Sequence, residues 1–344
     1  MVSAVALQTQ VPSEQERSVQ ARASAPSCIA ITGLNTFVGQ RLVERLLALP
    51  EPPRLLGIDL RLPLRFEGRI AFRRLDLTHP TADGELAAIL AQERVAVVVH
   101  LAFRRSPTAN HEYDHELETL GSLHVMHACS AAKVQRLVLA SSTMLYGPRP
   151  TNPNFLDEDR PLLGHRAAHC IQNRVETEDL LSEWAPRHPD VQVCVLRCCW
   201  VIGPTYVDHV VRYFEQPVVP VVLGYDPLLQ FIHEGDLLRV FEKATLEAHP
   251  GVYNVVGRGV LPLSTLLALA GKRRLSLPSR LLYRMANIPA HGQTGDLPAG
   301  FFDYLRYLWI ADGERGWQAF GEPVYTTKEA WVSFVSSRRM ERLR

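Results

Sequence analysis

The sequence contains no long apolar run and no strong net charge. Its best candidate for a membrane span, residues 193–203, is shorter than the about 18 apolar residues that a transmembrane helix needs, and Arg197 interrupts it. The formal net charge is +1, which leaves no overall field to attract nucleic acid or a membrane surface. We therefore expect no transmembrane helix, no nucleic-acid partner and no membrane partner.

The six cysteines do not follow the spacing of a metal site or of a disulfide framework. Several of them stand in apolar segments, where cysteine packs as a small hydrophobe. We therefore expect a reduced, cytoplasmic protein that carries no metal. The cysteines are Cys28, Cys129, Cys170, Cys194, Cys198 and Cys199.

The length of 344 residues is enough for one large α/β domain or for two lobes. Residues 1–26 are rich in Ser, Gln, Ala and Glu and lack the basic start and apolar core of a signal peptide, which indicates a disordered N-terminal tail. We expect a first domain over 27–203. A smaller, interleaved lobe follows over 204–344, where prolines interrupt a less regular pattern.

One stretch, residues 28–39, combines a strand pattern, a glycine turn and a helix pattern. This order opens a nucleotide-binding βαβ unit, in which the helix N-terminus offers free N–H groups to a pyrophosphate. Asp59 ends the next apolar run about 20 residues after Gly39, where a carboxylate that binds ribose is expected. Thr36 departs from the pattern, because a β-branched side chain replaces the glycine that lets backbone and pyrophosphate come close.

Segments typical of strands and helices alternate from residue 28 to about residue 200. Several strand segments are continuous apolar runs, as expected for parallel strands covered on both faces. The alternation predicts an α/β fold, a Rossmann-type doubly wound parallel sheet, with ligands at the carboxyl ends of the strands. The expected strands are 28–32, 54–59, 70–75, 95–101, 136–142 and 191–196, and the expected helices are 38–49, 84–93, 113–132 and 167–185. In the second lobe we expect helices over 235–247, 263–270, 278–286, 300–308 and 327–340 and strands near 219–223 and 252–256.

Further motifs follow that stretch in a defined order. Residues 140–147 read Ala-Ser-Ser-Thr-Met-Leu-Tyr-Gly at the end of the fifth expected strand. Later come Leu196-Arg197 with Gly203-Pro204, then Gln230-Phe231-Ile232-His233 with Asp236, and then Val252-Tyr253-Asn254-Val255. Together with Thr32-Gly33 and Gly39, these motifs resemble those of the extended short-chain dehydrogenase/reductase family, the NAD-dependent epimerase/dehydratase group. The resemblance covers about 28–335.

The resemblance implies a dinucleotide cofactor and a hydroxyl-bearing substrate, a nucleotide-sugar or another metabolite. Asp59 favours NAD because it would repel a 2′-phosphate, while Arg61 close by leaves NADP open. Family members often form homodimers through two helices, which correspond to those near 113–132 and 167–185. The cofactor-binding positions that the resemblance implies are Gly33, Thr36, Phe37, Val38, Gly39, Asp59, Asp76, Leu77, Leu101 and Ala102.

Family members carry out hydride transfer with a serine, a tyrosine and a lysine. The motif places the serine at Ser142, but no Tyr-x-x-x-Lys occurs between Ser142 and Val191. The alignment of the helix puts Cys170 at the tyrosine position and Arg174 at the lysine position. Glu118 stands where the family usually has a structural asparagine.

Substitutes for the missing pair are available in the sequence. A thiol has a reference pKa of about 8.5, so a nearby arginine could make Cys170 a thiolate, although it is shorter than a tyrosine. His165 and His169 titrate in the right range, and His169 is a possible substitute base. Equally, the two histidines could be ordinary loop and surface residues, and Cys170 a small packed side chain.

Two functions follow from these patterns. The first is a non-catalytic or regulatory protein that holds a nucleotide or a metabolite, indicated by the departures at Thr36, Glu118, Cys170 and Arg174. The second is an active NAD-dependent oxidoreductase or epimerase with a rearranged base. A histidine that points toward Ser142 across the pocket would favour the second function.

Overall fold

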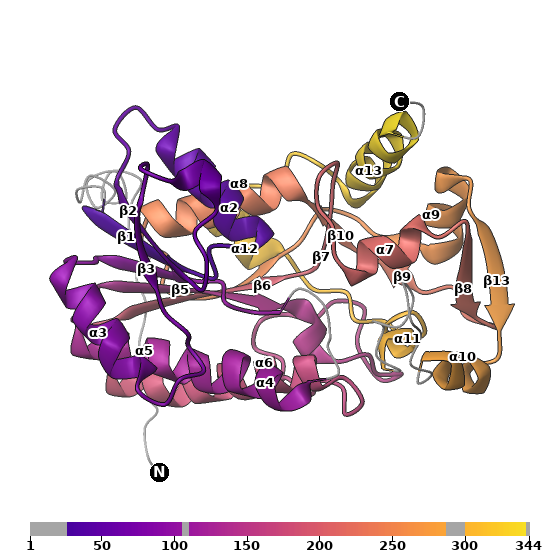
Figure 1. The fold of residues 1–344 in the computed structure, drawn as a ribbon. Coiled ribbons are helices and arrows are strands. Elements are labelled where there is room, and N and C mark those ends of the chain that lie inside the picture. The colour runs from indigo at the N-terminus through magenta and orange to yellow at the C-terminus, as the bar shows by residue number, and fades with distance from the viewer. Residues whose placement is uncertain (1–25, 105–109, 287–299, 342–344) are drawn as a thin grey trace, which may run out of the picture.

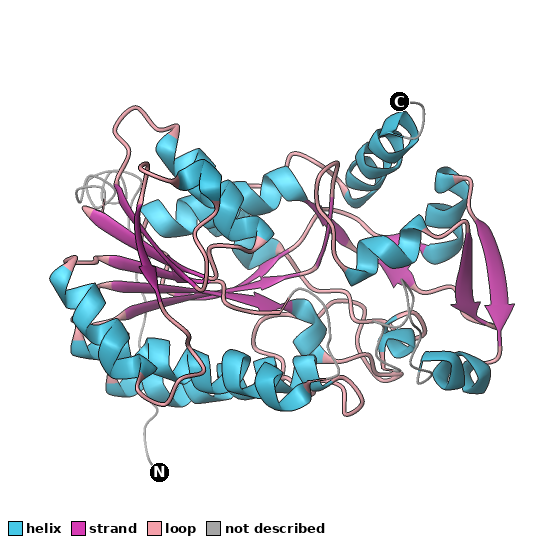
Figure 2. Cartoon of the chain, in the orientation of Figure 1, coloured by secondary structure: helices cyan, strands magenta, loops and turns pink. Residues whose placement is uncertain are grey.

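The structure is a computed structural model that describes residues 26–104, 110–286 and 300–341. Its centre is a seven-stranded sheet in the order β11-β6-β5-β4-β1-β2-β3, in which every pair of neighbours is parallel (Figure 1). Helices cover both faces (Figure 2). The predicted Rossmann-type doubly wound sheet is therefore confirmed. Its strands are β1 (Cys28–Thr32), β2 (Arg54–Asp59), β3 (Ala71–Arg74), β4 (Val97–His100), β5 (Arg136–Ser142), β6 (Gln192–Cys198) and β11 (Gly251–Val255).

The two faces of the sheet bury separate hydrophobic clusters. Along β1, Ile29 and Ile31 belong to one cluster, and Cys28 and Ala30 belong to the other. Successive side chains of a strand point to opposite faces, so a strand covered on both sides must be apolar throughout. One face carries α2 (Phe37–Leu47), α8 (Glu234–Leu246) and α12 (Glu314–Phe320); the other carries α3 (Ala82–Gln92), α4 (His111–His115), α5 (Gly121–Ala131) and α6 (His169–Trp184) (Figure 1).

The single helix expected over 113–132 is divided into three parts. A π-helical turn, Glu116–Leu120, lies between α4 and α5. Inside it Glu118 is fully buried, and its carbonyl oxygen accepts hydrogen bonds from the hydroxyls of Ser122 and Thr177. Single π turns inside helices are frequent at functional sites, and this one directs a carboxylate toward α6.

The second lobe is built from short paired strands and helices. The predicted strand near 219–223 is β8, but several short elements were not predicted, because strands of two to five residues carry little periodicity. The chain also returns to the first sheet after residue 204, since β11 pairs with β6 and α8 packs on α2. The remaining elements are β7 (Trp200–Ile202), α7 (His209–Glu215), β8 (Val218–Val222), β9 (Leu228–Leu229), β10 (Phe231–His233), β12 (Leu261–Pro262), α9 (Leu263–Ala270), β13 (Arg273–Leu277), α10 (Ser279–Ala286), α11 (Phe301–Tyr304) and α13 (Thr327–Glu341).

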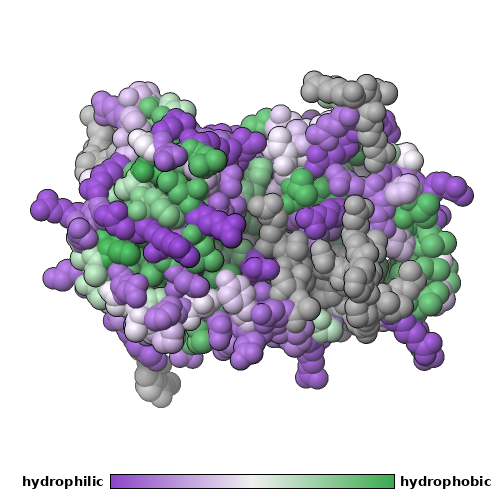
Figure 3. Space-filling model, in the orientation of Figure 1, coloured by the Kyte–Doolittle hydropathy of each residue, from purple (hydrophilic) through white to green (hydrophobic). Residues whose placement is uncertain are grey.

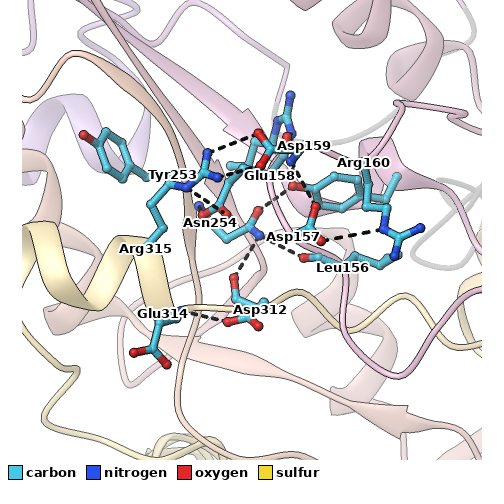
Figure 4. A network of polar contacts seen from close by, with 12 residues as sticks. Leu156, Asp157, Glu158, Asp159, Arg160, Tyr253, Asn254, Asp312, Glu314 and Arg315 are labelled. Atoms are coloured by element: carbon cyan, nitrogen blue, oxygen red, sulfur yellow. Dashed lines mark hydrogen bonds and ion pairs between the residues drawn. The ribbon is translucent and has the colours of Figure 1, made fainter. Parts of the chain in front are cut away.

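A polar network around β6 and β11 joins the two lobes (Figure 4). Asn254 of β11 accepts a hydrogen bond from the Tyr146 hydroxyl at 2.7 Å and donates to the carbonyl oxygens of Leu156 and Asp312 at 3.0 and 2.8 Å. Its backbone N–H donates to the Glu158 carboxylate at 2.8 Å. One side chain thus connects β11, the segment after β5 and the entry to α12.

Arg197 of β6 lies at the buried end of this network. Its guanidinium donates to both carboxylate oxygens of Glu178 at 2.7–3.2 Å, to the Tyr146 hydroxyl at 3.0 Å and to the Glu158 carbonyl oxygen at 2.9 Å. Glu178 also accepts a hydrogen bond from the Ser141 hydroxyl. Because both charged groups are buried, each compensates the charge of the other.

In the described ranges, no helix is both long and apolar enough to cross a membrane.

We predict that Arg197→Met lowers the free energy of unfolding by about 3–5 kcal/mol, because Glu178 would remain buried without its partner. Urea denaturation followed by circular dichroism measures the change. Arg187→Met is the matched control: its side chain is exposed and lies 3.9 Å from Glu183, so we expect a change within about 0.5 kcal/mol. A loss below about 1 kcal/mol in Arg197→Met would contradict the assigned role of the buried pair.

Candidate functional site

The turn after β1 has the geometry that a pyrophosphate site needs. Gly33 has φ +69°, and a Cβ there would lie 2.5 Å from the carbonyl carbon and oxygen of Leu101 and 2.6 Å from the nitrogen of Ala102. A Cβ at Gly39 would lie 2.7 Å from the carbonyl oxygen of Gly33. Both positions therefore require glycine, since the neighbouring atoms belong to the backbone and cannot move aside.

Thr36 acts as the N-cap of α2. Its hydroxyl accepts a hydrogen bond from the Gly39 N–H at 3.0 Å and donates to the Gly33 carbonyl oxygen at 2.8 Å. The residue has φ −69° and ψ 161°, a conformation that a β-branched side chain adopts without strain. The backbone N–H groups of Phe37 and Val38 have no acceptor among the described residues, so they remain available for an anion.

Asp59 lies at the carboxyl end of β2, beside this turn. Its carboxylate accepts hydrogen bonds from the backbone N–H of Asn35 at 2.8 Å and of Leu60 at 2.7 Å. Asn35 belongs to the turn itself, so the acid and the start of α2 are held together. Each carboxylate oxygen keeps a further lone pair for a ligand.

The remaining predicted cofactor positions surround the same strand ends. Asp76 is exposed, and its carboxylate accepts from the backbone N–H and the hydroxyl of Thr78 at 3.0 and 2.8 Å. Leu77, Leu101 and Ala102 are buried; Leu101 and Ala102 lie against Gly33 of the turn, and Leu77 lies against Gly121 of α5. Phe37 packs edge-on against Tyr206 of the second lobe at 5.0 Å between ring centroids.

Tyr113 of α4 lies near both acids. Burial raises the pKa of its phenol, the negative charge of Asp76 raises the pKa further, and Asp59 adds a smaller effect in the same direction. The guanidinium of Arg104 lies 5.9 Å from the ring centroid and opposes the shift. The sequence contained no motif around Tyr113, and only the fold brings it near Asp59 and Asp76.

A cavity of about 190 Å³ opens at the carboxyl ends of β5 and β6, and it brings together Ser142, Cys170 and Arg174. Val38 of α2 reaches the same cavity, so the cavity adjoins the helix N-terminus. Most of its lining is apolar. The apolar part includes Met144, Ile171, Trp200 and Val201 of the first domain and Val210, Leu237, Phe241, Phe301 and Tyr304 of the second lobe.

Ser142 lies at the end of β5, as the motif predicts. Its hydroxyl oxygen accepts a hydrogen bond from the Met144 N–H at 3.2 Å and caps the short 3₁₀ turn that follows. Tyr146 of the same motif does not line the cavity. It is buried in the network with Arg197, where burial raises the pKa of its phenol to about 12.

Arg174 is held by the protein at its charged end. Its Nη2 donates to the Arg104 carbonyl oxygen at 2.8 Å and lies 3.5 Å from Glu118 Oε1, and its guanidinium carbon lies 5.0 Å from the Phe103 ring centroid. Glu118 also accepts a hydrogen bond from the Arg104 N–H at 2.8 Å. Burial raises the pKa of Glu118, and Arg174 opposes that shift.

Cys170 lines the cavity as a protonated thiol. Burial raises its pKa to about 12, and the nearby Glu118 carboxylate adds to the increase. Arg174 lowers the pKa, but by less than burial raises it. The thiolate that a neighbouring arginine could have produced is therefore not the stable form at neutral pH.

Neither histidine that the sequence offered as a substitute base lines the cavity. His169 is exposed and lies against the ring of His111, with 4.3 Å between centroids. His165 Nε2 bonds the Asp303 carboxylate at 2.8 Å, and its Nδ1 accepts from the Ala167 N–H at 3.2 Å. His165 therefore connects the segment before α6 to α11.

Three neighbouring polar residues of the second lobe, Tyr206, Asp208 and His209, line the cavity and were missed by sequence reasoning. They follow directly after Gly203-Pro204, and that motif was the only local signal for them. Burial raises the pKa of the Asp208 carboxyl, while the positive charge of His209, the Val211 N–H and the Tyr206 side chain oppose the shift. Across the residues that the structure describes, no group of three or more potential ligands is placed to hold a metal ion.

The chain matches the family described as "NAD dependent epimerase/dehydratase family" over residues 29–256. Uncharacterized proteins of Mycobacterium bovis and Mycobacterium tuberculosis are each 29% identical to it over 321 residues, which cover 91% of this chain and 84% of theirs.

Solved structures of sugar-nucleotide enzymes are similar in fold. UDP-glucose 4-epimerase of Thermotoga maritima, solved with UDP-glucose, has a TM-score of 0.68 at 18% identity and covers 92% of this chain and 100% of its own. UDP-glucose 4-epimerase of Thermus thermophilus, in complex with NAD, has a TM-score of 0.66 at 22% identity, with 91% and 99% covered. dTDP-glucose 4,6-dehydratase of Bacillus anthracis, also with NAD, has a TM-score of 0.67 at 16% identity, with 92% and 97% covered.

At such low sequence identities, the similarity to these solved structures shows the fold alone. The match to the family covers more than half of the sequence. The chain belongs to the NAD-dependent epimerase/dehydratase family.

Proposed function

We propose that this protein binds NAD and acts as a non-catalytic or regulatory member of its family. The observation that carries the proposal is the engagement of Arg174. Its guanidinium is bound to Glu118 and to the Arg104 carbonyl oxygen, so the position of the family lysine holds a cation that already has partners.

The NAD part of the proposal rests on the turn after β1 and on Asp59. Gly33 and Gly39 let the backbone of the turn pack closely on its neighbours, and the N–H groups of Phe37 and Val38 can receive a pyrophosphate. Asp59 can accept hydrogen bonds from a ribose and would repel a 2′-phosphate. The epimerase of Thermus thermophilus and the dehydratase of Bacillus anthracis, which share this fold, were solved with NAD.

The non-catalytic part rests on the missing base. When NAD is bound, its nicotinamide supplies hydride chemistry, which needs a protein group to take a proton from the substrate hydroxyl. Cys170 is protonated at neutral pH and shorter than a tyrosine, and Ser142 accepts its hydrogen bond from a backbone N–H. Neither His165 nor His169 lines the cavity.

A specific observation favours the second candidate, an active oxidoreductase or epimerase with a rearranged base. Tyr206, Asp208 and His209 line the same cavity as Ser142, from the opposite lobe. An imidazole supported by a carboxylate is a common general base. The imidazole of the second lobe, rather than a residue of α6, would then take the proton from the substrate hydroxyl.

Turnover separates the two candidates. We predict that the protein mixed with NAD⁺ and UDP-glucose forms neither reduced nicotinamide, followed by absorbance, nor an epimerised sugar, followed by chromatography. Turnover would contradict the proposal. In that case His209→Ala should lower the rate at least about 100-fold, while His169→Ala, which changes an exposed residue outside the cavity, should leave it unchanged.

Calorimetric titration tests the cofactor. We predict that NAD⁺ or NADH binds in the micromolar range and that NADP⁺ and NADPH bind more weakly. Asp59→Asn keeps the acceptor for the Asn35 N–H but removes the charge, so it should weaken NAD⁺ binding about tenfold and narrow the preference over NADP⁺. Asp190→Asn, at an exposed position, is the control. Absence of binding by all four nucleotides would refute the cofactor assignment.

Alkylation by iodoacetamide tests the state of Cys170. With a pKa of about 12, roughly one thiol in ten thousand is ionised at pH 8, so labelling measured by mass spectrometry should be at least about 100-fold slower than for an exposed thiol. The rate should rise about tenfold for each pH unit. Ser182→Cys supplies the exposed reference on the same helix. Labelling of Cys170 as fast as this introduced thiol would show an activated nucleophile instead.

A further inference from the structure

A basic surface lies at the end of the second lobe that is farthest from the main sheet (Figure 1). From residue 248 to residue 286 the sequence contains no Asp or Glu. Within this range the arginines concentrate on β13 and α10, which lie at that end beside β8 and α9 (Figure 1). The distal patch is defined by six exposed residues: Arg273, Arg274, Leu275, Arg280, Leu281 and Arg284.

The strand β13 supplies half of the distal patch. It pairs only with β8 among the described strands, and its register places Arg273 beside Val218 and Leu275 beside Pro220. Leu275 is 47% exposed and Val218 is 39% exposed. Since residues two apart share a face, Arg273 and Leu275 lie on one face of the strand with Val218 of β8 beside them, and Arg274 lies on the other face.

The helix α10 supplies the other half. Leu282 is buried, so the helix is anchored through that side. Arg280 and Arg284 are four residues apart and therefore share a face, and Leu281, 44% exposed, lies next to them. Figure 3 shows hydrophobic residues gathered over this end of the molecule, with hydrophilic residues on either side.

The four arginines of the distal patch make no ion pair and no side-chain hydrogen bond within the described part of the chain. Elsewhere arginines such as Arg315 and Arg338 are paired with carboxylates. Charges on the edge of a small sheet protect the edge from pairing with another chain, and Arg273 and Arg274 serve that purpose. Edge protection does not explain Arg280 and Arg284 on a helix, nor the exposed leucines between the charges.

We propose that the distal patch binds the surface of a membrane containing anionic lipids. Arginines place their guanidinium groups at the lipid phosphates, while neighbouring leucines enter the boundary between headgroups and acyl chains. A nucleic acid would also attract the charges, but the patch offers it leucines rather than the aromatic and amide side chains that bind bases. The whole-chain charge of +1 hid this surface, because acidic residues elsewhere balance it.

Co-sedimentation with lipid vesicles tests the proposal on the full-length protein. Vesicles of phosphatidylcholine and phosphatidylglycerol in equal parts should bind the protein, and pure phosphatidylcholine should not. Binding should weaken strongly between 0.1 M and 1 M salt, as the screening length falls from about 10 Å to about 3 Å. Arg280→Gln/Arg284→Gln should lower the partition coefficient about 25-fold, roughly fivefold for each charge.

Two further variants distinguish membrane binding through the distal patch from an effect of net charge and from nucleic-acid binding. Arg69→Gln/Arg187→Gln removes the same charge from exposed positions in the first domain and should leave vesicle binding unchanged. Leu275→Ser/Leu281→Ser should lower vesicle binding about tenfold without changing the charge. The proposal fails if anionic vesicles do not bind, if the Arg69/Arg187 control loses binding equally, or if the leucine variant binds normally while labelled single-stranded DNA binds more tightly than vesicles.

Discussion

Two ion pairs hold the helix α6, and the geometry of the cavity depends on them. Glu178 pairs with Arg197 of β6, and one turn earlier Arg174 pairs with Glu118 of the π turn. Both carboxylates are buried, so loss of either cation would leave a charge in a medium of low polarity. This constraint holds Cys170 and Ser142 in the lining of the same cavity, and it gives the charge of Arg174 a partner inside the protein.

The substitutions at positions 118 and 174 are best understood together. An arginine is permanently charged and needs acceptors in fixed directions, and Glu118 and the Arg104 carbonyl oxygen supply them. Burial and the negative charge of Glu118 raise the pKa of the Cys170 thiol by more than Arg174 lowers it, so the thiol stays protonated. In this arrangement the charge of Arg174 has partners within the protein, and the thiol of Cys170 carries its proton.

Thr36 shows how a departure from a motif can be compatible with the fold. The first N–H groups of α2 have no acceptor within the helix. The Thr36 hydroxyl accepts a hydrogen bond from one of them, the N–H of Gly39, and not from those of Phe37 and Val38. Capping of this kind stabilises a helix by about 1 kcal/mol. The position that the motif reserves for close approach thus contributes to the stability of α2.

Apolar periodicity and turn residues are local properties of a sequence. For that reason the Rossmann-type sheet, the glycines of its first turn and the family could all be predicted before the structure was known. The sequence also brought Ser142, Cys170 and Arg174 to one place through motif spacing. The pairing of Arg174 with Glu118 and the position of His169 outside the cavity became known only from the three-dimensional structure. The same holds for the presence of Tyr206, Asp208 and His209 in the cavity lining and for the short strand pairs of the second lobe. These contacts join residues that are far apart in the chain, and no local pattern encodes the distance between them.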